Sequence, residues 1–392
     1  MTRGQSGTLK PGLRLSFLDA LRGIAALTVL WHHVFVLYPN VFENLATSAP
    51  MLWSAAYWVS GQNKNAVLLF FVISGFSIRL ALEKDDIFKT GGPSLYAKRR
   101  AARILPLYWV ALLWTALLGL LSGSKDPSFG FPTLIGNLLF LQTSEAARGA
   151  WFAPYGLNGP LWSLSYEVAY YVILPVVLLL AGRTQVHNSR FTERLLIISL
   201  ITSVGAIGIS YALPSPLTSF LGLWHVWVFG YFIGDCFLRE RRTKLIAIPA
   251  AAALAAQALM KSVGVNSATV DLLTAGIFIA TGLSVTMLLA KKFPNPIKRT
   301  VPKIVTNALS WLGGGSYAIY LLHYPLLLAL SQFGLGSWSF WHILIAFSLL
   351  AVFVIVLCPL LEQSLRDPGF WLVGLARKSR RSASGIKNDV IS

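Results

Sequence analysis

The chain has 392 residues, of which 55% are hydrophobic and only 12% are charged, and its mean hydropathy is +0.63. Because a water-soluble domain carries roughly 25% charged residues, this composition excludes a soluble enzyme, a coiled coil and a disordered chain. It predicts an all-α, polytopic integral membrane protein. We interpret the formal net charge of +18, from 33 basic and 15 acidic residues, as membrane topology rather than as nucleic-acid binding.

Ten segments are apolar over close to the 20 residues that a transmembrane helix needs. An apolar run at 131–141 is too short to cross the bilayer, so we expect it to be re-entrant or to lie at the surface. The ten expected spans are at about 20–38, 57–78, 103–122, 161–181, 195–213, 222–238, 245–261, 269–290, 311–331 and 339–361.

The basic residues orient these spans. With the N-terminus inside, 29 of the 33 lysines and arginines fall in cytoplasmic segments, which predicts that both termini are cytoplasmic. We expect a basic cytoplasmic segment at 1–15, a membrane domain at 16–362 and a disordered basic cytoplasmic tail at 363–392. The two cysteines, Cys236 and Cys358, lie near cytoplasmic helix ends, where we expect neither a disulfide nor a metal site.

The first span carries an arginine and a histidine. An ionisable side chain at the bilayer centre costs roughly 2.5–3.5 kcal/mol, so such residues are functional candidates. Arg22 and His33 are eleven residues apart and share one helix face, about 16 Å apart along the axis. Asp19 can pair with Arg22, whereas His32 points about 100° away from His33. The alternative interpretation is a snorkelling arginine and a structural histidine.

Glu167 and His323 lie in two other spans, at a depth similar to that of His33 in the outer half of the membrane. Two histidines and one carboxylate from three spans at one depth predict a site. Asp235, by contrast, is expected to meet water at the cytoplasmic end of the sixth span, and His225 to lie at the outer interface. We attribute the glycines at 313–315 to close helix packing.

Three arginines, Arg99, Arg100 and Arg103, begin the third span on its cytoplasmic side. Arg103 follows the other two by four and three residues, so one helix face presents several guanidinium groups. Their planar, forked donors suit phosphate groups. The alternative is an anchor that touches anionic lipid headgroups.

Five motifs in order make the chain resemble the acyltransferase 3 family of bacterial membrane acyltransferases, over about residues 15–362. Each lies on the membrane side that the family pattern requires. The motifs are Leu18-Asp19-x-Leu21-Arg22-Gly23 with His33, Phe70-Phe71-Val72-Ile73-Ser74-Gly75-Phe76, Arg99-Arg100-x-x-Arg103-Ile104-x-Pro106-x-Tyr108-Trp109, Trp162-Ser163-Leu164-Ser165-x-Glu167, and Ser316-Tyr317-x-x-Tyr320-Leu321-x-His323-x-Pro325.

The resemblance implies a membrane acyltransferase domain at 16–362 in the bacterial inner membrane. It implies transfer of an acyl group, usually acetyl, from cytoplasmic acyl-CoA to a hydroxyl of an envelope carbohydrate, a glycolipid or an exported polysaccharide. The implied partners are this acceptor, acyl-CoA and membrane lipids, with neither a metal nor nucleic acid. The implied catalytic residues are Arg22, His33, Glu167 and His323, with acyl-CoA held by Arg99, Arg100 and Arg103 and the acceptor by Asp19, Trp162, Ser165 and Tyr320.

The chain also departs from the family pattern. Many members have two successive acidic residues where this chain has Glu167 and then Val168, which resembles the exopolysaccharide branch more than the O-antigen branch. O-acyl transfer needs a base for the acceptor hydroxyl, and the neutral imidazole of His33 fits; a covalent acyl-histidine is the less favoured variant. Two other functions stay open: a transporter or flippase for a lipid-linked sugar that uses the same residues as a proton relay, and a non-catalytic membrane subunit.

Overall fold

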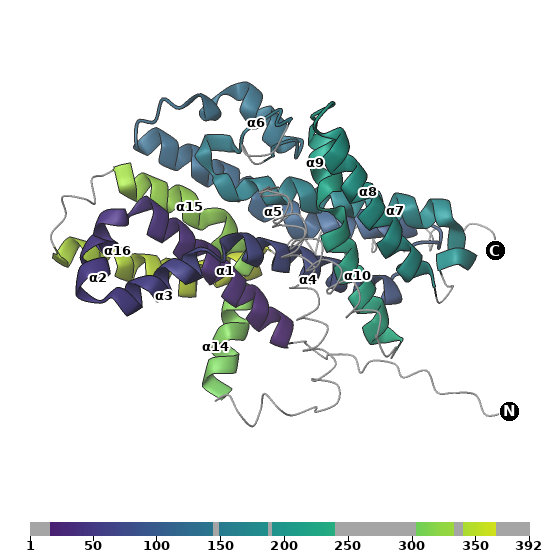
Figure 1. Ribbon diagram of the computed structural model, residues 1–392, viewed down its shortest axis with the longest axis horizontal. Helices are drawn as coiled ribbons and strands as arrows, with labels where there is room; N and C mark the ends of the chain where they lie inside the picture. The colour runs from purple at the N-terminus through teal and green to yellow at the C-terminus, as the bar shows by residue number, and fades with distance from the viewer. Residues whose placement is uncertain (1–15, 144–148, 187–189, 240–302, 333–339, 366–392) are drawn as a thin grey trace, which may run out of the picture.

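The computed structural model describes residues 16–143, 149–186, 190–239, 303–332 and 340–365, which form helices joined by loops (Figure 1). The all-α class is confirmed for this part of the chain. Seven helical segments are long and apolar enough to cross a membrane, and Ser316–Ser331 is apolar but shorter. These eight correspond to eight of the ten predicted spans, since those predicted at 245–261 and 269–290 lie outside the described residues. The count of ten and the cytoplasmic side of both termini stay predictions.

The helices follow one another along the chain with short connections. The longer ones are α1 (Ser16–Leu37), α2 (Pro39–Ser48), α3 (Pro50–Ser60), α4 (Asn63–Lys84), α5 (Gly92–Leu121), α7 (Trp162–Val186), α8 (Phe191–Ile209), α10 (Trp224–Leu238), α14 (Lys303–Gly314), α15 (Ser316–Gln332) and α16 (Phe340–Val352). Two shorter helices are α6 (Phe131–Leu138) and α9 (Pro216–Gly222), and a π-helical turn at Phe353–Leu357 continues α16.

Two predicted spans have other boundaries than expected. The second, expected at 57–78, is α4, which begins at Asn63 after a turn at Gly61 ends α3. The ninth, expected at 311–331, is broken at Gly315 into α14 and α15, because successive glycines weaken a helix. The apolar run at 131–141 forms only the eight-residue α6, which is too short to cross a bilayer, as expected.

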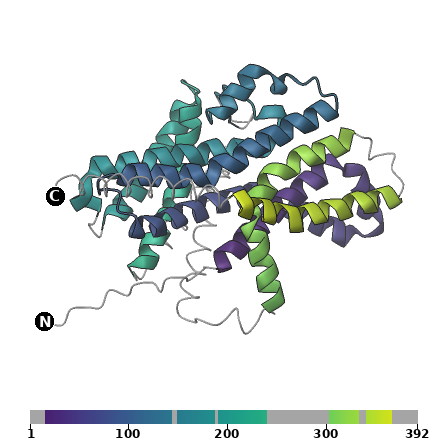
Figure 2. The same ribbon diagram turned by 180° about the vertical axis from the view of Figure 1, so that it is seen from behind.

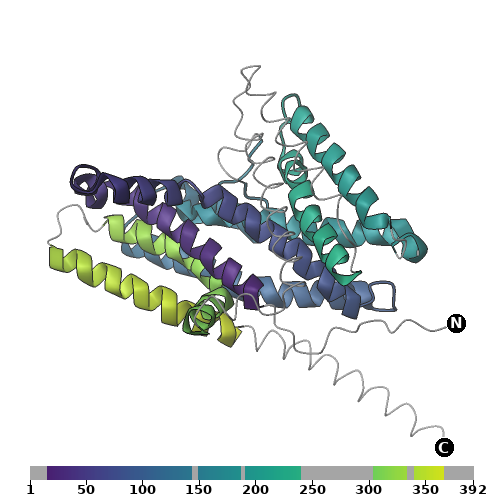
Figure 3. The same cartoon turned by 60° about the horizontal axis from the view of Figure 1, so that its bottom comes forward.

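Helix α4 lies at the centre of the molecule, between α1 and α10 (Figure 3). Helix α1 packs in turn against α14 and α15, and α15 runs beside α5, as the view from behind shows (Figure 2). Helix α8 packs against α10. The first span and the ninth are therefore neighbours, although about 290 residues separate them in the sequence.

Glycines allow the closest helix contacts. A Cβ at Gly75 of α4 would overlap the carbonyl oxygen of Trp227, and a Cβ at Gly230 of α10 would overlap that of Val72. A Cβ at Gly313 would likewise overlap the backbone of α1 at Asp19. The prediction that the glycine run at 313–315 serves close helix packing is therefore confirmed.

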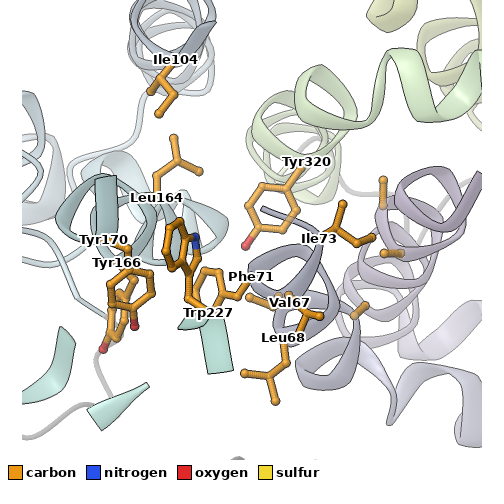
Figure 4. Close-up of a cluster of buried hydrophobic side chains, with 14 of the residues drawn as sticks. Val67, Leu68, Phe71, Ile73, Ile104, Leu164, Tyr166, Tyr170, Trp227 and Tyr320 are labelled. Atoms are coloured by element: carbon orange, nitrogen blue, oxygen red, sulfur yellow. The ribbon is translucent and has the colours of Figure 1, made fainter. Parts of the chain in front are cut away.

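Aromatic side chains fill the space between α4, α7 and α10 (Figure 4). Tyr170 and Trp227 are completely buried. The ring centroid of Tyr170 lies 5.8 Å from that of Phe71 and 6.0 Å from that of Trp227. Such pairs contribute roughly 0.5–1.5 kcal/mol each beyond the area that they bury, so this cluster fixes the three helices relative to one another.

Asp235 is buried rather than exposed to water, which corrects the expectation from the sequence. Its Oδ1 accepts hydrogen bonds from Nε of Arg79 at 2.9 Å and of Arg239 at 2.8 Å, and its Oδ2 accepts one from Thr192 at 3.0 Å. A carboxylate removed from water needs such partners, and these join α4, α8 and α10. His225 is also buried, at 2% exposure, and not interfacial, because α8 and α9 pack against α10.

We predict that Gly75→Ala destabilises the protein by about 1–3 kcal/mol, because the added methyl group forces α4 away from α10. Thermal unfolding of the purified protein in detergent measures the effect. Gly205→Ala in α8 is the matched control, since a Cβ there meets open space and alanine favours the helix. Equal melting temperatures for Gly75→Ala and wild type would contradict the proposed close contact.

Candidate functional site

The structure brings together two of the predicted site residues, His33 of α1 and His323 of α15. Nδ1 of His33 lies 2.9 Å from Nε2 of His323, and the ring centroids are 5.0 Å apart. His323 is completely buried, whereas His33 is only partly buried. Of the two imidazoles, His33 is therefore the one that a substrate can reach.

The hydrogen bonds of His323 determine which nitrogen of His33 carries a proton. Nδ1 of His323 lies 2.7 Å from the carbonyl oxygen of Ile319, which can only accept, so this nitrogen must be protonated. In a neutral His323 the other nitrogen, Nε2, is then an acceptor, and Nδ1 of His33 must donate to it. Nε2 of His33 is left with a free lone pair, which is the form that a general base requires.

A proline shapes the segment of α15 that carries His323. Pro325 has no N–H group, so it leaves the carbonyl oxygen of Leu321 without its helical donor. Asn158 supplies a donor instead, from Nδ2 at 3.1 Å, and Nε1 of Trp114 donates to the next carbonyl, that of Leu322, at 3.2 Å. These two bonds hold α15 beside α5 at the level of the histidine.

His32 is directed toward a different neighbour from His33. Its Nδ1 lies 3.0 Å from the carbonyl oxygen of Ser60 and 3.1 Å from the hydroxyl oxygen of the same residue, at the end of α3. The predicted divergence of the two adjacent histidines is therefore confirmed. His32 ties α1 to α3, whereas His33 meets α15.

Glu167 is not hydrogen-bonded to either imidazole. Its Oε1 accepts hydrogen bonds from the hydroxyl groups of Ser74 at 2.6 Å and Tyr171 at 2.5 Å, and Ser74 also accepts one from Nε1 of Trp227 at 3.2 Å. The carboxylate thus joins α7 to α4 and, through Ser74, to α10. The sequence named Glu167 but not these partners, although Ser74 belongs to the second motif.

Arg22 pairs with Asp19 at 3.1 Å, as predicted, and donates from Nη2 to the hydroxyl oxygen of Ser77 at 2.7 Å. Ser77 is three residues beyond Ser74 on α4, so Arg22 lies on the side of the molecule that holds Glu167. Because α1 is one continuous helix, Arg22 remains about 16 Å along its axis from His33. The two residues belong to different parts of the site.

The three arginines of α5 have different surroundings. Arg99 pairs with Asp85, the residue that ends α4. Arg100 packs its guanidinium group against an aromatic ring of its own helix and another of α7. Arg103 is exposed and has no hydrogen bond or ion pair to a residue in the described part of the chain. The predicted single face of three equivalent guanidinium groups is thus divided into three environments.

Arg103 lines a cleft between α5, the start of α15 and the end of the last span. Oε2 of Glu362 accepts hydrogen bonds from the backbone N–H groups of Tyr317 and Ala318, each at 3.1 Å. A carboxylate at a helix N-terminus satisfies free N–H groups and is stabilised by the helix dipole. The sequence analysis missed Glu362, an acidic residue at the end of an apolar run. The cleft is lined by Ala102, Arg103, Pro106, Leu107, Tyr317, Glu362 and Leu365.

Residues predicted to contact the acceptor have clear structural partners. The hydroxyl of Ser165 is buried and donates to the carbonyl oxygen of Gln142 at 2.5 Å. The hydroxyl oxygens of Tyr320 and Ser163 are 2.8 Å apart, and Trp162 packs edge-on against Tyr166. Tyr320 lies beside His323, with ring centroids 6.4 Å apart, so it is the predicted acceptor residue next to the imidazole pair.

Comparison with known proteins gives a consistent family. A family model described as an acyltransferase domain matches residues 15–361. The chain is 28% identical over 170 residues to acyltransferase MdmB of Streptomyces mycarofaciens, which covers 42% of this chain and 39% of MdmB. It is 32% identical over 173 residues to protein 2 in the picA locus of Rhizobium radiobacter, which covers 40% of this chain and 79% of that protein. No solved structure matches the chain.

We predict that Asn158→Leu destabilises the protein by about 1–3 kcal/mol, because the carbonyl oxygen of Leu321 is then buried without a donor. In a Pro325→Ala background the restored N–H group can reach that oxygen, so the same change should cost about 1 kcal/mol less. Thermal unfolding of the two single variants and the double variant measures this coupling. Additive effects would show that the amide does not compensate for the proline.

Proposed function

Because this chain belongs to the acyltransferase 3 family, we propose that it is a multi-pass enzyme of the bacterial inner membrane that O-acylates a carbohydrate. The acyl group, acetyl in the simplest case, comes from acyl-CoA, and the acceptor is a hydroxyl of an envelope glycan, a glycolipid or an exported polysaccharide. The observation that carries this proposal is the hydrogen bond between His33 and His323. It supplies a correctly protonated base inside an apolar domain.

In the proposed reaction, Nε2 of His33 takes the proton from the acceptor hydroxyl as its oxygen attacks the thioester carbonyl. The C–O bond forms, the C–S bond breaks, and the coenzyme leaves as a thiolate that receives the proton from His33. General-base catalysis of this kind contributes typically 10²–10⁴-fold to the rate. His323 is a positioning residue, because it fixes the protonated nitrogen and the orientation of the His33 ring.

The donor is proposed to enter from the cleft at Arg103. An exposed guanidinium without a described partner suits a phosphate group of the coenzyme. Polar groups then continue into the domain along α4, from Arg22 and Ser77 to Ser74 and Glu167. An extended pantetheine arm along this route would carry the thioester the remaining distance toward His33. Arg22 accordingly holds the donor and does not act on the carbonyl that His33 serves.

The acceptor is proposed to approach from the opposite side of the membrane. The segment between α5 and α7 exposes the aromatic side chains of Phe131 and Trp151, at 72% and 62%, and aromatic planes suit sugar rings. Tyr320, which is hydrogen-bonded to Ser163 beside His323, is the nearest predicted acceptor contact to the imidazole pair. Donor and acceptor would thus meet at His33 from the two membrane faces.

We predict that His33→Ala lowers acyl transfer by at least about 10²-fold while acyl-CoA still binds, because only the base is lost. The measurement is transfer of a radiolabelled acetyl group from acetyl-CoA to envelope glycans in membranes, with coenzyme binding to the purified protein measured alongside.

His32→Ala is the matched control for this experiment. It removes an adjacent histidine that bonds Ser60, so it should lower stability more than the rate per folded molecule. His323→Gln keeps a hydrogen-bond acceptor for His33 and should retain more activity than His323→Leu. Equal loss in the His32 and His33 variants would remove the base from α1, and binding of no acyl-CoA by the wild type would favour the flippase instead.

We predict that Arg103→Ala weakens acyl-CoA binding by about 10–100-fold, which corresponds to one charge-assisted hydrogen bond. Arg103→Lys should recover part of the affinity, since the charge returns without the planar fork. Arg99→Ala is the control, because that guanidinium is already paired with Asp85 and should matter less. Isothermal titration of the purified variants decides; the reverse ranking would assign Arg103 to lipid contact.

A further inference from the structure

Two buried hydrogen-bond donors on α5 have no acceptor in the described part of the chain. They are the hydroxyl group of Tyr96 and Nε of Arg100. Tyr96 is only 6% exposed. Because a buried donor without a partner costs free energy, such groups are normally paired, and two of them together call for an explanation.

The two donors are neighbours on one helix face. Tyr96 and Arg100 are four residues apart, and Cζ of Arg100 lies 5.9 Å from the ring centroid of Tyr96. On its other side the same Cζ lies 6.0 Å from the ring centroid of Tyr171. Two rings therefore hold the guanidinium group in place, while its Nε and the Tyr96 hydroxyl remain available to an acceptor.

No described carboxylate neutralises Arg100. The adjacent Arg99 is paired with Asp85, and the described hydrogen bonds of Glu167 come from Ser74 and Tyr171. Arg100 is only partly buried, so a ligand can approach the guanidinium group. A fixed positive charge with an unpaired hydroxyl donor beside it is complementary to an anion that carries several acceptor oxygens.

The position of the pair on α5 relates it to the cleft. Arg103 lies seven residues beyond Tyr96, which places Arg103 on the same face about 10 Å further along the helix axis. A ligand with two phosphate groups can thus contact Arg103 with one and the Tyr96–Arg100 pair with the other.

We propose that Tyr96 and Arg100 form a second phosphate-binding subsite on α5, separate from the Arg103 cleft. The proposal rests on the proposed function insofar as the nucleotide end of acyl-CoA supplies the phosphate. The headgroup of an anionic phospholipid presents the same chemistry and is the other possible source. In either case Tyr96 is a specificity-determining residue, because its hydroxyl donates to a phosphate oxygen only when the ligand is bound.

The test compares Tyr96→Phe with Tyr170→Phe, a variant of a tyrosine that is equally buried but already donates to the carbonyl oxygen of Phe220 at 2.9 Å. The melting temperature of each full-length protein in detergent is measured alone, with CoA, with pantetheine, which lacks phosphate, and with phosphatidic acid. Tyr96→Phe should leave the unliganded protein as stable as the wild type or more so, since it removes an unpaired donor. Tyr170→Phe should lower that stability.

The expected result is that Tyr96→Phe weakens binding of a phosphate-bearing ligand about tenfold, whereas Tyr170→Phe leaves it unchanged and pantetheine does not distinguish the variants. Loss of the CoA shift assigns the phosphate to the donor; loss of the phosphatidic acid shift alone assigns it to lipid. Arg100→Gln should reproduce the loss and serves if Tyr96→Phe does not fold. Unchanged shifts in both variants, or no shift of the wild type with either ligand, would overturn the subsite, whereas the proposed function is tested separately by His33→Ala.

Discussion

The absence of water inside the helical domain is the constraint on which its structure depends. Each polar group removed from water must find a partner within the protein, because leaving it unpaired costs several kcal/mol. Asp235 accordingly gathers Arg79, Arg239 and Thr192 from three helices. The carbonyl oxygen that Pro325 leaves without a donor is met by Asn158. The same requirement joins the two histidines, so the interactions that stabilise the fold also determine the protonation of the site.

Depth in the membrane could be predicted from the sequence, and lateral neighbours could not. A helix rises by a fixed amount per residue, so the positions of His33 and His323 along their spans already placed both at one level. Which groups face each other at that level depends on the order in which the helices pack. Glu167 therefore met the serine and tyrosine of α4 and its own helix rather than an imidazole, and the interface expected at His225 was covered by α8 and α9.

The arginines of α5 show the same limit in another form. Helical periodicity correctly places Arg99, Arg100 and Arg103 near one another, but it contains no information about what approaches each side chain. A carboxylate at the end of α4 reaches the first, two aromatic rings enclose the second, and the third opens into a cleft. Equal residues in one motif thus acquire unequal availability to a ligand, which only the packing of α4, α7 and α15 determines.

The direction of the hydrogen bonds at the histidine pair has a consequence for proton movement through the membrane. The chain of donors runs from His33 to His323 and ends at the carbonyl oxygen of Ile319, which cannot take up a proton. A proton that arrives on Nε2 of His33 has no onward route through this pair and can leave only from the atom that received it. The pair can therefore borrow and return a proton within one reaction, while the bilayer stays insulated against a leak of the proton gradient at this point.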